Sequence, residues 1–262
     1  IQVSWLSPGT TGLAEIDYFL GSHYLTPKNE ENHFVEKIWR LPEVLQCFTP
    51  PNFNLEVSKL PALKNGYITF GSLNNFSKIN NEKVYEIWSK ILKSIPNSKL
   101  ILKYKQFDDE ELKKNLYKKF NNLEIDQKKI ILMGSSRTRK EVFKTYELID
   151  IALDPFPFQG NTTTCEAAWM GVPTLTLKGD RFLFHFGEAI NNNLGLHEWI
   201  AKNFNEYISK AINFSLNLKK LEKIRQNLRK NALTSPVFNP DCFSEHFEKA
   251  LFEMWKMYLN KI

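Results

Sequence analysis

Several features that define other protein classes are missing from this sequence of 262 residues. Its three cysteines, Cys47, Cys165 and Cys242, lie far apart and form no CxxC pair, which argues against a disulfide framework or a zinc knuckle. No run of about 18 apolar residues occurs, so no membrane-spanning helix and no membrane partner are expected. No signal peptide is visible. A reducing, cytoplasmic location is therefore the prediction.

Common signatures of nucleotide-binding and hydrolytic enzymes are also missing. The sequence has no GxxxxGK[ST] phosphate loop, no GxGxxG that would favour NAD, and no GxSxG nucleophile elbow. Its five histidines form no close metal-ligand pair, so no metal is predicted. The net charge of +6 comes from lysines scattered over helix-like stretches, which is typical of solvated helix faces. Because no recognition motif accompanies the charge, we predict no nucleic-acid partner, although the surplus can attract a phosphate-bearing small molecule.

The sequence does have a regular alternation of strand-like and helix-like segments from Gly66 onward. Strand, helix, strand at this spacing predicts βαβ units and an α/β fold with a parallel sheet buried on both faces. After Gly179 only helical patterns follow, and these helices should pack around the sheet. We expect strands at 67–72, 99–103, 129–134, 150–156 and 172–179, separated by helices at 80–96, 108–123, 138–149 and 162–171.

The first 65 residues fit this alternation less well. A strand-like run at the start leads into a Gly/Pro/Thr loop, and Pro50-Pro51 indicates a linker before a new domain. We place the boundary near residues 60–66, which divides the chain into residues 1–60 and 61–262. Because the chain starts with Ile1 inside an apolar run, we expect a fragment of a longer protein.

Polar segments follow the first, third and fourth predicted strands: GSLNNFSK, MGSSRTRK and DPFPFQGNTTT. In an open parallel sheet, ligands bind beyond the carboxyl ends of the strands, so these segments should line one crevice. The last one enters a helix whose free N–H groups can bind phosphate. Gly160 allows a close approach, the hydroxyls of 162–164 can add donors, and Glu166 can accept two sugar hydroxyls. The alternative is a threonine cap with Glu166 completing a capping box.

Cationic and amide side chains accompany the same crevice. Lys78 can neutralise a diphosphate and stabilise its charge as it leaves, or it can be an ordinary surface lysine. Asn75 can donate to a phosphate oxygen or cap the next helix. Arg137, Arg139 and Lys140 stand at a helix start, where a solvated turn explains them equally well.

Three stretches carry a resemblance to a known family: ITFGSLNNFSKI, LDPFPFQGNTTTCEAAWMGVPTLTLKGDR and IQVSWLSPGTTGLAEIDYFL. Together they resemble the catalytic region of the protein O-GlcNAc transferase, or SPINDLY-like, family (glycosyltransferase family 41). The resemblance implies a GT-B fold, in which two Rossmann-like lobes hold a nucleotide-sugar between them. Residues 61–262 would be the C-terminal, donor-binding lobe with its closing helices. Residues 1–60 would be the end of the N-terminal lobe and the inter-lobe connection, with the rest of that lobe and tetratricopeptide repeats upstream.

The resemblance also implies roles for individual residues. Lys78 matches the family lysine that contacts the donor diphosphate and supports departure of the leaving group. Asn75 matches a polar position beside that diphosphate, and Thr162 and Thr163 match a hydroxyl pair there; Gly160, Asn161 and Thr164 complete the diphosphate cradle. Glu166 matches the acidic residue that holds the ribose.

Two positions depart from the family pattern. Val142 stands where the family often has a histidine that stacks near the uracil, so the base of the donor is open. Asn161 stands where some members have a histidine. The loop Ser7–Gly12 resembles the one that approaches the donor sugar from the other lobe, which makes Gly9 and Thr10 candidates there. Arg137 and Arg139 are further candidates near the sugar or base.

The function that the resemblance implies is an inverting, metal-independent transfer of a sugar to Ser or Thr of a protein acceptor. The expected donor is UDP-GlcNAc, used as a substrate, and no cofactor is expected. Three alternatives stay open: a nucleotide-sugar-binding lobe that is inactive alone; a GT-B enzyme with another donor or acceptor, such as GDP-fucose, glucose to asparagine, or a glycan; and a helical interaction module that binds no nucleotide.

Overall fold

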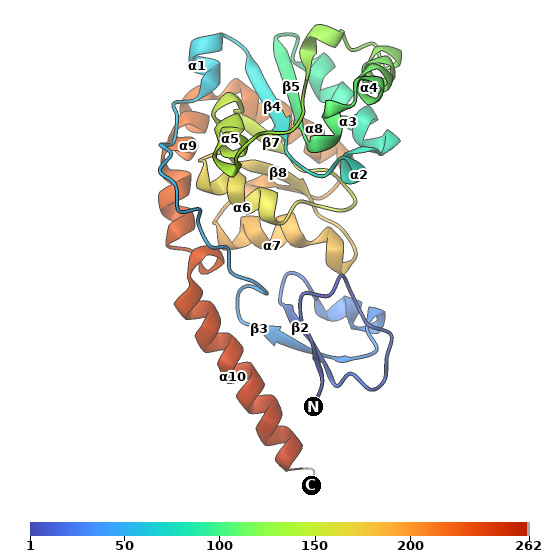
Figure 1. Cartoon of the computed structure of the whole chain (residues 1–262), viewed down its shortest axis with the longest axis vertical. Coiled ribbons are helices and arrows are strands. Elements are labelled where there is room, and N and C mark those ends of the chain that lie inside the picture. Colours follow the sequence, from blue (N-terminus) through green and yellow to red (C-terminus); the bar gives the residue numbers. More distant parts are fainter. Residues whose placement is uncertain (261–262) are drawn as a thin grey trace.

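The structure is a computed structural model, and it describes residues 1–260. It contains two parallel sheets (Figure 1). The larger sheet has six strands in the order β6-β5-β4-β7-β8-β9, and the smaller has three in the order β1-β2-β3. The predicted parallel α/β fold is therefore confirmed. Within residues 1–260, none of the helices combines the length and the apolarity that crossing a bilayer requires.

The strands of the small sheet are β1 (Val3–Ser4), β2 (Tyr18–Ser22) and β3 (Lys37–Leu41). Those of the large sheet are β4 (Ile68–Ser72), β5 (Ser98–Lys103), β6 (Ile130–Met133), β7 (Ile151–Leu153), β8 (Thr174–Leu177) and β9 (Ile200–Ala201). The helices are α1 (Pro61–Asn65), α2 (Phe76–Ile79), α3 (Glu82–Ser94), α4 (Glu110–Asn122), α5 (Arg139–Lys144), α6 (Thr162–Trp169), α7 (Phe186–Asn193), α8 (Phe204–Leu216), α9 (Leu218–Leu233) and α10 (Pro240–Leu259).

The large sheet is buried on both faces, as its apolar strands predict. Side chains alternate between the faces along each strand. In β5, Leu100 and Leu102 pack into one hydrophobic cluster with α3, α4 and α8, whereas Ile101 packs into a second cluster with α5, α6 and α7. In β7, Ile151 and Ala152 divide in the same way.

The order of the strands fixes where a ligand can bind. From β4 the chain moves outward to β5 and β6, and it then returns to β7 on the other side of β4 before continuing to β8 and β9. The carboxyl ends of β4 and β7 therefore flank the point at which the chain changes direction. In sheets of this kind that point opens a crevice for ligands.

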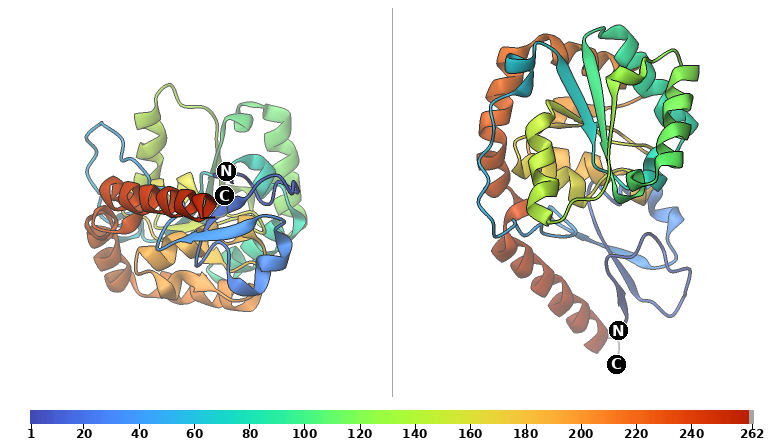
Figure 2. Two further views of the ribbon diagram at one scale, coloured as in Figure 1. Left: turned by 90° about the horizontal axis from the view of Figure 1, so that it is seen from below. Right: turned by 45° about the horizontal axis from the view of Figure 1, so that its top comes forward.

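The small sheet and the last helix pack together. A third hydrophobic cluster combines Phe19 of β2 with Ala189 of α7 and with Ala250 and Met254 of α10. Figure 2 shows α10 running beside the small sheet, with the end of this helix close to the N-terminus of the chain. The final helix thus packs back across the N-terminal part. The division into residues 1–60 and 61–262 stays a prediction.

The sequence patterns did not reveal β2, β3 and β9. All five residues of β2 are buried, so it lacks the alternation of a half-exposed strand, and the sequence KIWRL of β3 carries two charges. Strand β9 has only two residues, fewer than a periodic pattern requires. The predicted helix at 138–149 is α only in α5 and continues as a 3-10 turn, Thr145–Leu148.

Candidate functional site

The mouth of α6 lies just beyond the carboxyl end of β7. Asn161 is the N-cap residue of α6, but its side chain makes no capping hydrogen bond. Instead its Oδ1 accepts a hydrogen bond of 2.6 Å from Nε2 of Gln46, in the segment after β3. The first N–H groups of a helix have no partner within the helix, so those of α6 can still bind an anion.

The capping-box explanation of this motif is wrong. With Asn161 at the N-cap, the box would need its carboxylate at Thr164, three residues on. Glu166 lies in the second turn of α6 and pairs with Arg139 of α5, whose Nη2 is 3.4 Å from the carboxylate. Glu166 therefore pairs with a residue of α5 and does not cap α6.

A buried carboxylate holds the loop that leads into α6. Asp154 is 1% exposed, and its Oδ1 accepts a hydrogen bond of 2.6 Å from the N–H of Gly160. Its Oδ2 accepts one of 2.8 Å from the hydroxyl of Thr176. Burial raises the pKa of Asp154 to about 7, and these two hydrogen bonds and the charge of Lys78 offset that effect only in part. This role of Asp154 was not predicted from the sequence, where the available signal was an acid at the end of an apolar strand.

Gly160 has no room for a side chain. A Cβ added there would lie 2.5 Å from Oγ1 of Thr163, 2.9 Å from Oγ1 of Thr164 and 3.0 Å from Oδ1 of Asn74. Contacts below 3 Å between such atoms are repulsive, so any larger residue would displace the hydroxyls at the start of α6. The backbone at Gly160 thus lies close to the side chains of Thr163 and Thr164, which explains why a glycine is needed there.

The three threonines differ in exposure. Thr162 is exposed, Thr163 is partly buried, and Thr164 is only 2% exposed. The hydroxyl of Thr163 donates to Oδ1 of Asn74 at 3.0 Å. The hydroxyl of Thr164 is buried without a hydrogen-bond partner in the protein. Thr162 and Thr163 are therefore at the mouth, and Thr164 is the least accessible of the three.

Lys78 joins the segments that follow β4 and β7. Its Nζ donates a hydrogen bond of 2.7 Å to the carbonyl of Gln159 and lies 3.7 Å from the ring centroid of Phe158. Burial lowers the pKa of Lys78, and the carboxylate of Asp154 opposes this change. Gln159 is itself fully buried and accepts a hydrogen bond of 2.6 Å from the N–H of Gly187. Two of the three polar segments that were expected to lie together, those after β4 and β7, are thus in contact.

The two asparagines after β4 have different surroundings. Asn75 is exposed, and its Oδ1 accepts from the N–H of Ser77 at 3.1 Å, which caps α2. Asn74 is buried and contacts both Thr163 and Ser72. The structure therefore supports the capping alternative for Asn75 and makes Asn74 a neighbour of the α6 mouth, which the sequence analysis missed.

Glu166 is mostly buried, whereas its partner is not. The side chain of Glu166 is 13% exposed and that of Arg139 is 58% exposed. Burial raises the pKa of Glu166, and the charge of Arg139 counteracts this only in part. Arg137 lies on the surface, where its backbone N–H donates to Glu141 at 2.8 Å. Val142 packs against the hydrophobic cluster on its face of the sheet. Because valine is aliphatic, this position has no ring that could stack on a nucleobase.

The loop Ser7–Gly12 is held by a carboxylate of its own part of the chain. Glu36 accepts hydrogen bonds of 2.6 Å from the hydroxyl of Thr10 and from the N–H of Thr11. Burial alone would raise the pKa of Glu36, but these hydrogen bonds bring it down to about 2. Around Gly9, an added Cβ would meet nothing within 4 Å. The loop is thus fixed at Thr10 and open at Gly9.

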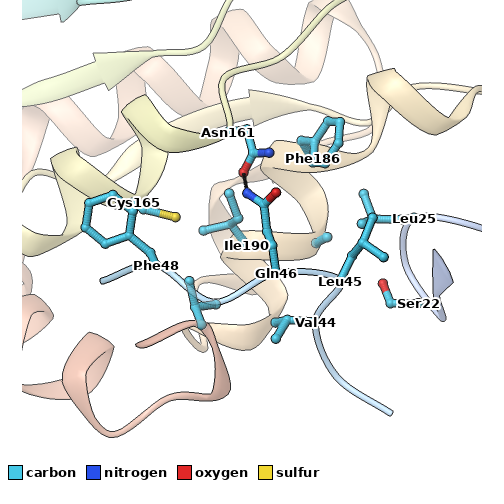
Figure 3. A pocket seen from close by; sticks show the side chains of 12 residues that line it. Ser22, Leu25, Val44, Leu45, Gln46, Phe48, Asn161, Cys165, Phe186 and Ile190 are labelled. Carbon is cyan, nitrogen blue, oxygen red and sulfur yellow. Dashed lines mark hydrogen bonds between the residues drawn. The ribbon is translucent and has the colours of Figure 1, made fainter. Parts of the chain in front are cut away.

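The N-terminal part contacts the site through Gln46. Figure 3 shows Gln46 and Asn161 pointing toward one another beside Cys165, Phe48 and Ile190. The cavity that they border measures about 30 Å³, far below the roughly 300–1,000 Å³ of a small-molecule pocket. This cavity is therefore too small to be a nucleotide site. What matters here is the hydrogen bond between Gln46 and Asn161 at the start of α6.

A buried ion network also joins the two parts. Nε2 of His185 lies 3.0 Å from Glu30, and Nδ1 lies 3.0 Å from Glu188, which also binds Nζ of Lys178 at 2.7 Å. Burial by itself would lower the pKa of His185, but the hydrogen bonds and charges of the two carboxylates raise it. Glu30 belongs to the segment between β2 and β3, so the network fixes that segment to the start of α7.

Comparisons with known proteins were made for the sequence and for the structure. The sequence model of "Glycosyl transferase family 41" matches residues 49–247. The SPINDLY proteins of Hordeum vulgare and Arabidopsis thaliana are each 36% identical over 99% and 98% of this chain, and SEC of Arabidopsis thaliana is 28% identical over 99%. All three are named as probable UDP-N-acetylglucosamine–peptide N-acetylglucosaminyltransferases. The chain spans about 28% of the length of these relatives.

Two solved structures illustrate the structural likeness. A mutant O-GlcNAc transferase of Thermobaculum terrenum superposes with a TM-score of 0.89 at 29% identity, over 97% of this chain and 48% of that one. WaaG, a glycosyltransferase involved in lipopolysaccharide biosynthesis, superposes with a TM-score of 0.55 at 14% identity, over 92% of this chain and 63% of that one. The second likeness concerns the fold alone.

Proposed function

Because this chain belongs to glycosyl transferase family 41, we propose that its crevice binds a nucleotide-diphosphate sugar. The whole protein would transfer the sugar to Ser or Thr hydroxyls of acceptor proteins, with UDP-GlcNAc as the first candidate donor. The relatives at 36% identity carry names that specify this donor and a peptide acceptor. The observation that carries the proposal is the uncapped mouth of α6, with Lys78 held beside it.

The diphosphate would bind at this mouth. The free N–H groups of α6 and the hydroxyls of Thr162 and Thr163 supply neutral donors, and the helix dipole favours the negative charge. Lys78 now donates to a neutral carbonyl, Gln159 O. A phosphate oxygen is a stronger acceptor because the hydrogen bond becomes charge-assisted on both sides. The ammonium group of Lys78 would therefore exchange its hydrogen bond to Gln159 O for one to a phosphate oxygen.

The ribose would bind Glu166. Its carboxylate can accept hydrogen bonds from both ribose hydroxyls at once. The contact with Arg139 is long at 3.4 Å and comes from a side chain that is 58% exposed, so a ligand displaces it at little cost.

In the transfer step, an acceptor hydroxyl oxygen forms a bond to the anomeric carbon while the bond from that carbon to the diphosphate breaks. The leaving diphosphate keeps the electron pair, and Lys78, the threonines and the α6 N–H groups stabilise its charge without a metal ion. The configuration at the anomeric carbon inverts. The acceptor hydroxyl gives up its proton to a general base, and we assign no such base among the residues of this chain.

Other parts of the protein complete this proposal. The chain spans about 28% of its curated relatives, and we propose that the remainder of the N-terminal lobe and tetratricopeptide repeats belong to the whole protein and help to bind the acceptor. A reducing cytoplasm is the proposed location, which fits the three free thiols Cys47, Cys165 and Cys242. If the missing lobe is essential for turnover, this chain binds the donor but is inactive alone.

One observation leaves a second donor, GDP-fucose, open. Val142 stands where the resemblance leads one to expect a histidine near the uracil, and its side chain packs into a hydrophobic cluster. A site without that ring makes no stacking contact that would select uracil. The diphosphate and ribose contacts proposed above are the same for either nucleotide.

The test is calorimetric titration of the chain with UDP, GDP and UMP. Glu166→Ala should weaken UDP and UMP alike, by about tenfold or more, because both carry the ribose. Lys78→Ala should weaken UDP more than UMP, because only UDP carries the second phosphate. Lys114→Ala removes the same charge from the exposed face of α4 and should change nothing.

Each result separates one hypothesis from another. UDP binding above GDP supports a UDP-sugar, and the reverse preference supports GDP-fucose. If neither this chain nor a longer protein with its N-terminal lobe binds any nucleotide, the proposal is refuted and the interaction-module alternative gains support.

A further inference from the structure

A cluster of three metal-ligand types lies outside the donor crevice. Cys242 and His246 are one helical turn apart on α10, and Glu43 belongs to the segment that follows β3. His246 Nδ1 is 2.8 Å from a carboxylate oxygen of Glu43 and 3.8 Å from Sγ of Cys242. All three ligand atoms lie within 4.8 Å of one another, and each residue is partly buried.

These separations are close to those around a zinc ion. Zinc binds thiolate at about 2.3 Å and imidazole or carboxylate at about 2.0–2.2 Å in a tetrahedral arrangement. That arrangement places sulfur and nitrogen about 3.6 Å apart and nitrogen and oxygen about 3.4 Å apart. The observed distances, 3.8 Å between sulfur and nitrogen and 2.8 Å between nitrogen and oxygen, would change by about 0.2 Å and 0.6 Å, which side-chain rotation can supply.

From this geometry we propose that Glu43, Cys242 and His246 bind one Zn²⁺ ion, with water in the fourth position. Thiolate, imidazole and carboxylate together favour zinc over magnesium or calcium, which take oxygen ligands. The i, i+4 spacing keeps Cys242 and His246 on one face of α10 without any change of backbone.

The backbone around the cluster is already ordered. Asn239 caps α10 by accepting a hydrogen bond of 3.1 Å from the N–H of Cys242. Cys242 therefore sits in the first turn of a 20-residue helix. An ion pair between His246 and Glu43 explains the positions of these two side chains only. A zinc site explains in addition why the thiol of Cys242 lies beside them.

The ion would cross-link two segments of the chain. It would tie the start of α10 to the segment after β3, and three residues beyond Glu43 the same segment provides Gln46, which holds Asn161 at the α6 mouth. The zinc site would thus stabilise the connection between the small sheet and the donor crevice. It is separate from the proposed transfer chemistry, which needs no metal.

The test uses the purified chain, stripped of metal with a chelator and then titrated with Zn²⁺ against a chromophoric competitor. We expect one Zn²⁺ per chain and a thermal midpoint that rises with free Zn²⁺. Cys242→Ser and His246→Gln should each weaken Zn²⁺ binding by more than the roughly 10- to 100-fold that loss of an outer-shell partner costs. Glu248→Gln, an exposed carboxylate on the same helix, is the matched control and should bind Zn²⁺ normally.

Substitution with Co²⁺ tests the ligands directly. The Co²⁺ form should show a thiolate-to-cobalt charge-transfer band in the near ultraviolet, and Cys242→Ser should abolish it. Far-ultraviolet circular dichroism of the metal-free variants checks that they remain folded. The proposal is overturned if Zn²⁺ does not bind, if the band is absent, or if Cys242→Ser binds Zn²⁺ as tightly as the control.

Discussion

Replacement of His185 by glutamine should destabilise the protein in a pH-dependent way. His185 is 1% exposed and lies between Glu30 and Glu188, which are 10% and 8% exposed. When protonated, its imidazolium donates to both carboxylates. In His185→Gln a neutral amide replaces the cation, and the two carboxylates stay buried. The variant therefore isolates the contribution of a single buried charge.

The expected loss of stability depends on the hydrogen bonds that the two carboxylates keep in the variant. Removal of one member of a buried ion pair costs about 3–5 kcal/mol. Glu188 keeps its bond of 2.7 Å to Lys178, and the glutamine amide can still donate to one carboxylate. We therefore expect a loss of about 3 kcal/mol at pH 6, at the low end of that range.

The sign of the pH dependence follows from the pKa shifts. Folding raises the pKa of His185 above its ordinary 6.5, so its stabilisation is fully present below pH 6.5 and is lost as the pH rises through the folded value. Folding lowers the pKa of Glu188 below its ordinary 4.5, so that contribution is lost as the pH falls through the lowered value. The stability cost of His185→Gln should therefore be smaller above the folded pKa of His185 than at pH 6.

The assay is urea unfolding followed by circular dichroism, for the native protein and the variant, at pH 6 and pH 9. His197→Gln is the control, because His197 is exposed and bonds only Asn192; it should change stability by no more than about 0.5 kcal/mol. A loss below about 1 kcal/mol at pH 6 would show that His185 is not held as a buried cation.

Three further substitutions test other parts of the structure. Gly160→Ala should weaken UDP binding at least about tenfold in calorimetry, because its methyl group meets hydroxyls below 3 Å, whereas Gly9→Ala, with open space around it, should leave the fold unchanged. Arg225→Met should cost about 3–5 kcal/mol in urea unfolding, because the fully buried guanidinium makes four hydrogen bonds, including two to Ser58. Asp154→Asn should cost about 1–3 kcal/mol in the same assay, since an amide cannot accept from both of its present donors; a neutral result would mean that the loop is held by other contacts.

The general architecture could be predicted because its signals are local. The apolar runs that became β4, β5, β6, β7 and β8 are short and separated by helices with clear apolar periodicity. The rule that ligands bind at strand carboxyl ends places the candidate site beyond β4 and β7, and that site stays a prediction. The family and the fold type that the sequence resemblance implied are confirmed by the match over residues 49–247 and by the structural likeness.

The remaining details could not be predicted because they depend on which side chains turn inward. Asn74 and Asn75 are chemically identical neighbours, and only the fold shows that the first is buried against Thr163 while the second caps a short helix. Glu30 and His185 are 155 residues apart in the sequence, so no spacing rule connects them. Tertiary burial, rather than local pattern, decided each of these cases.

The third hydrophobic cluster has a consequence for the design of chimeric enzymes. Its members come from the small sheet, from α7 and from α10, so a junction at residue 60 would separate side chains that pack together. A graft of residues 61–262 onto a foreign N-terminal lobe would carry α10 away from the strands that cover Ala250 and Met254. A crossover that exchanges α10 together with β1, β2 and β3 keeps these apolar surfaces matched, and such hybrids should stay soluble where the simpler junction yields aggregates.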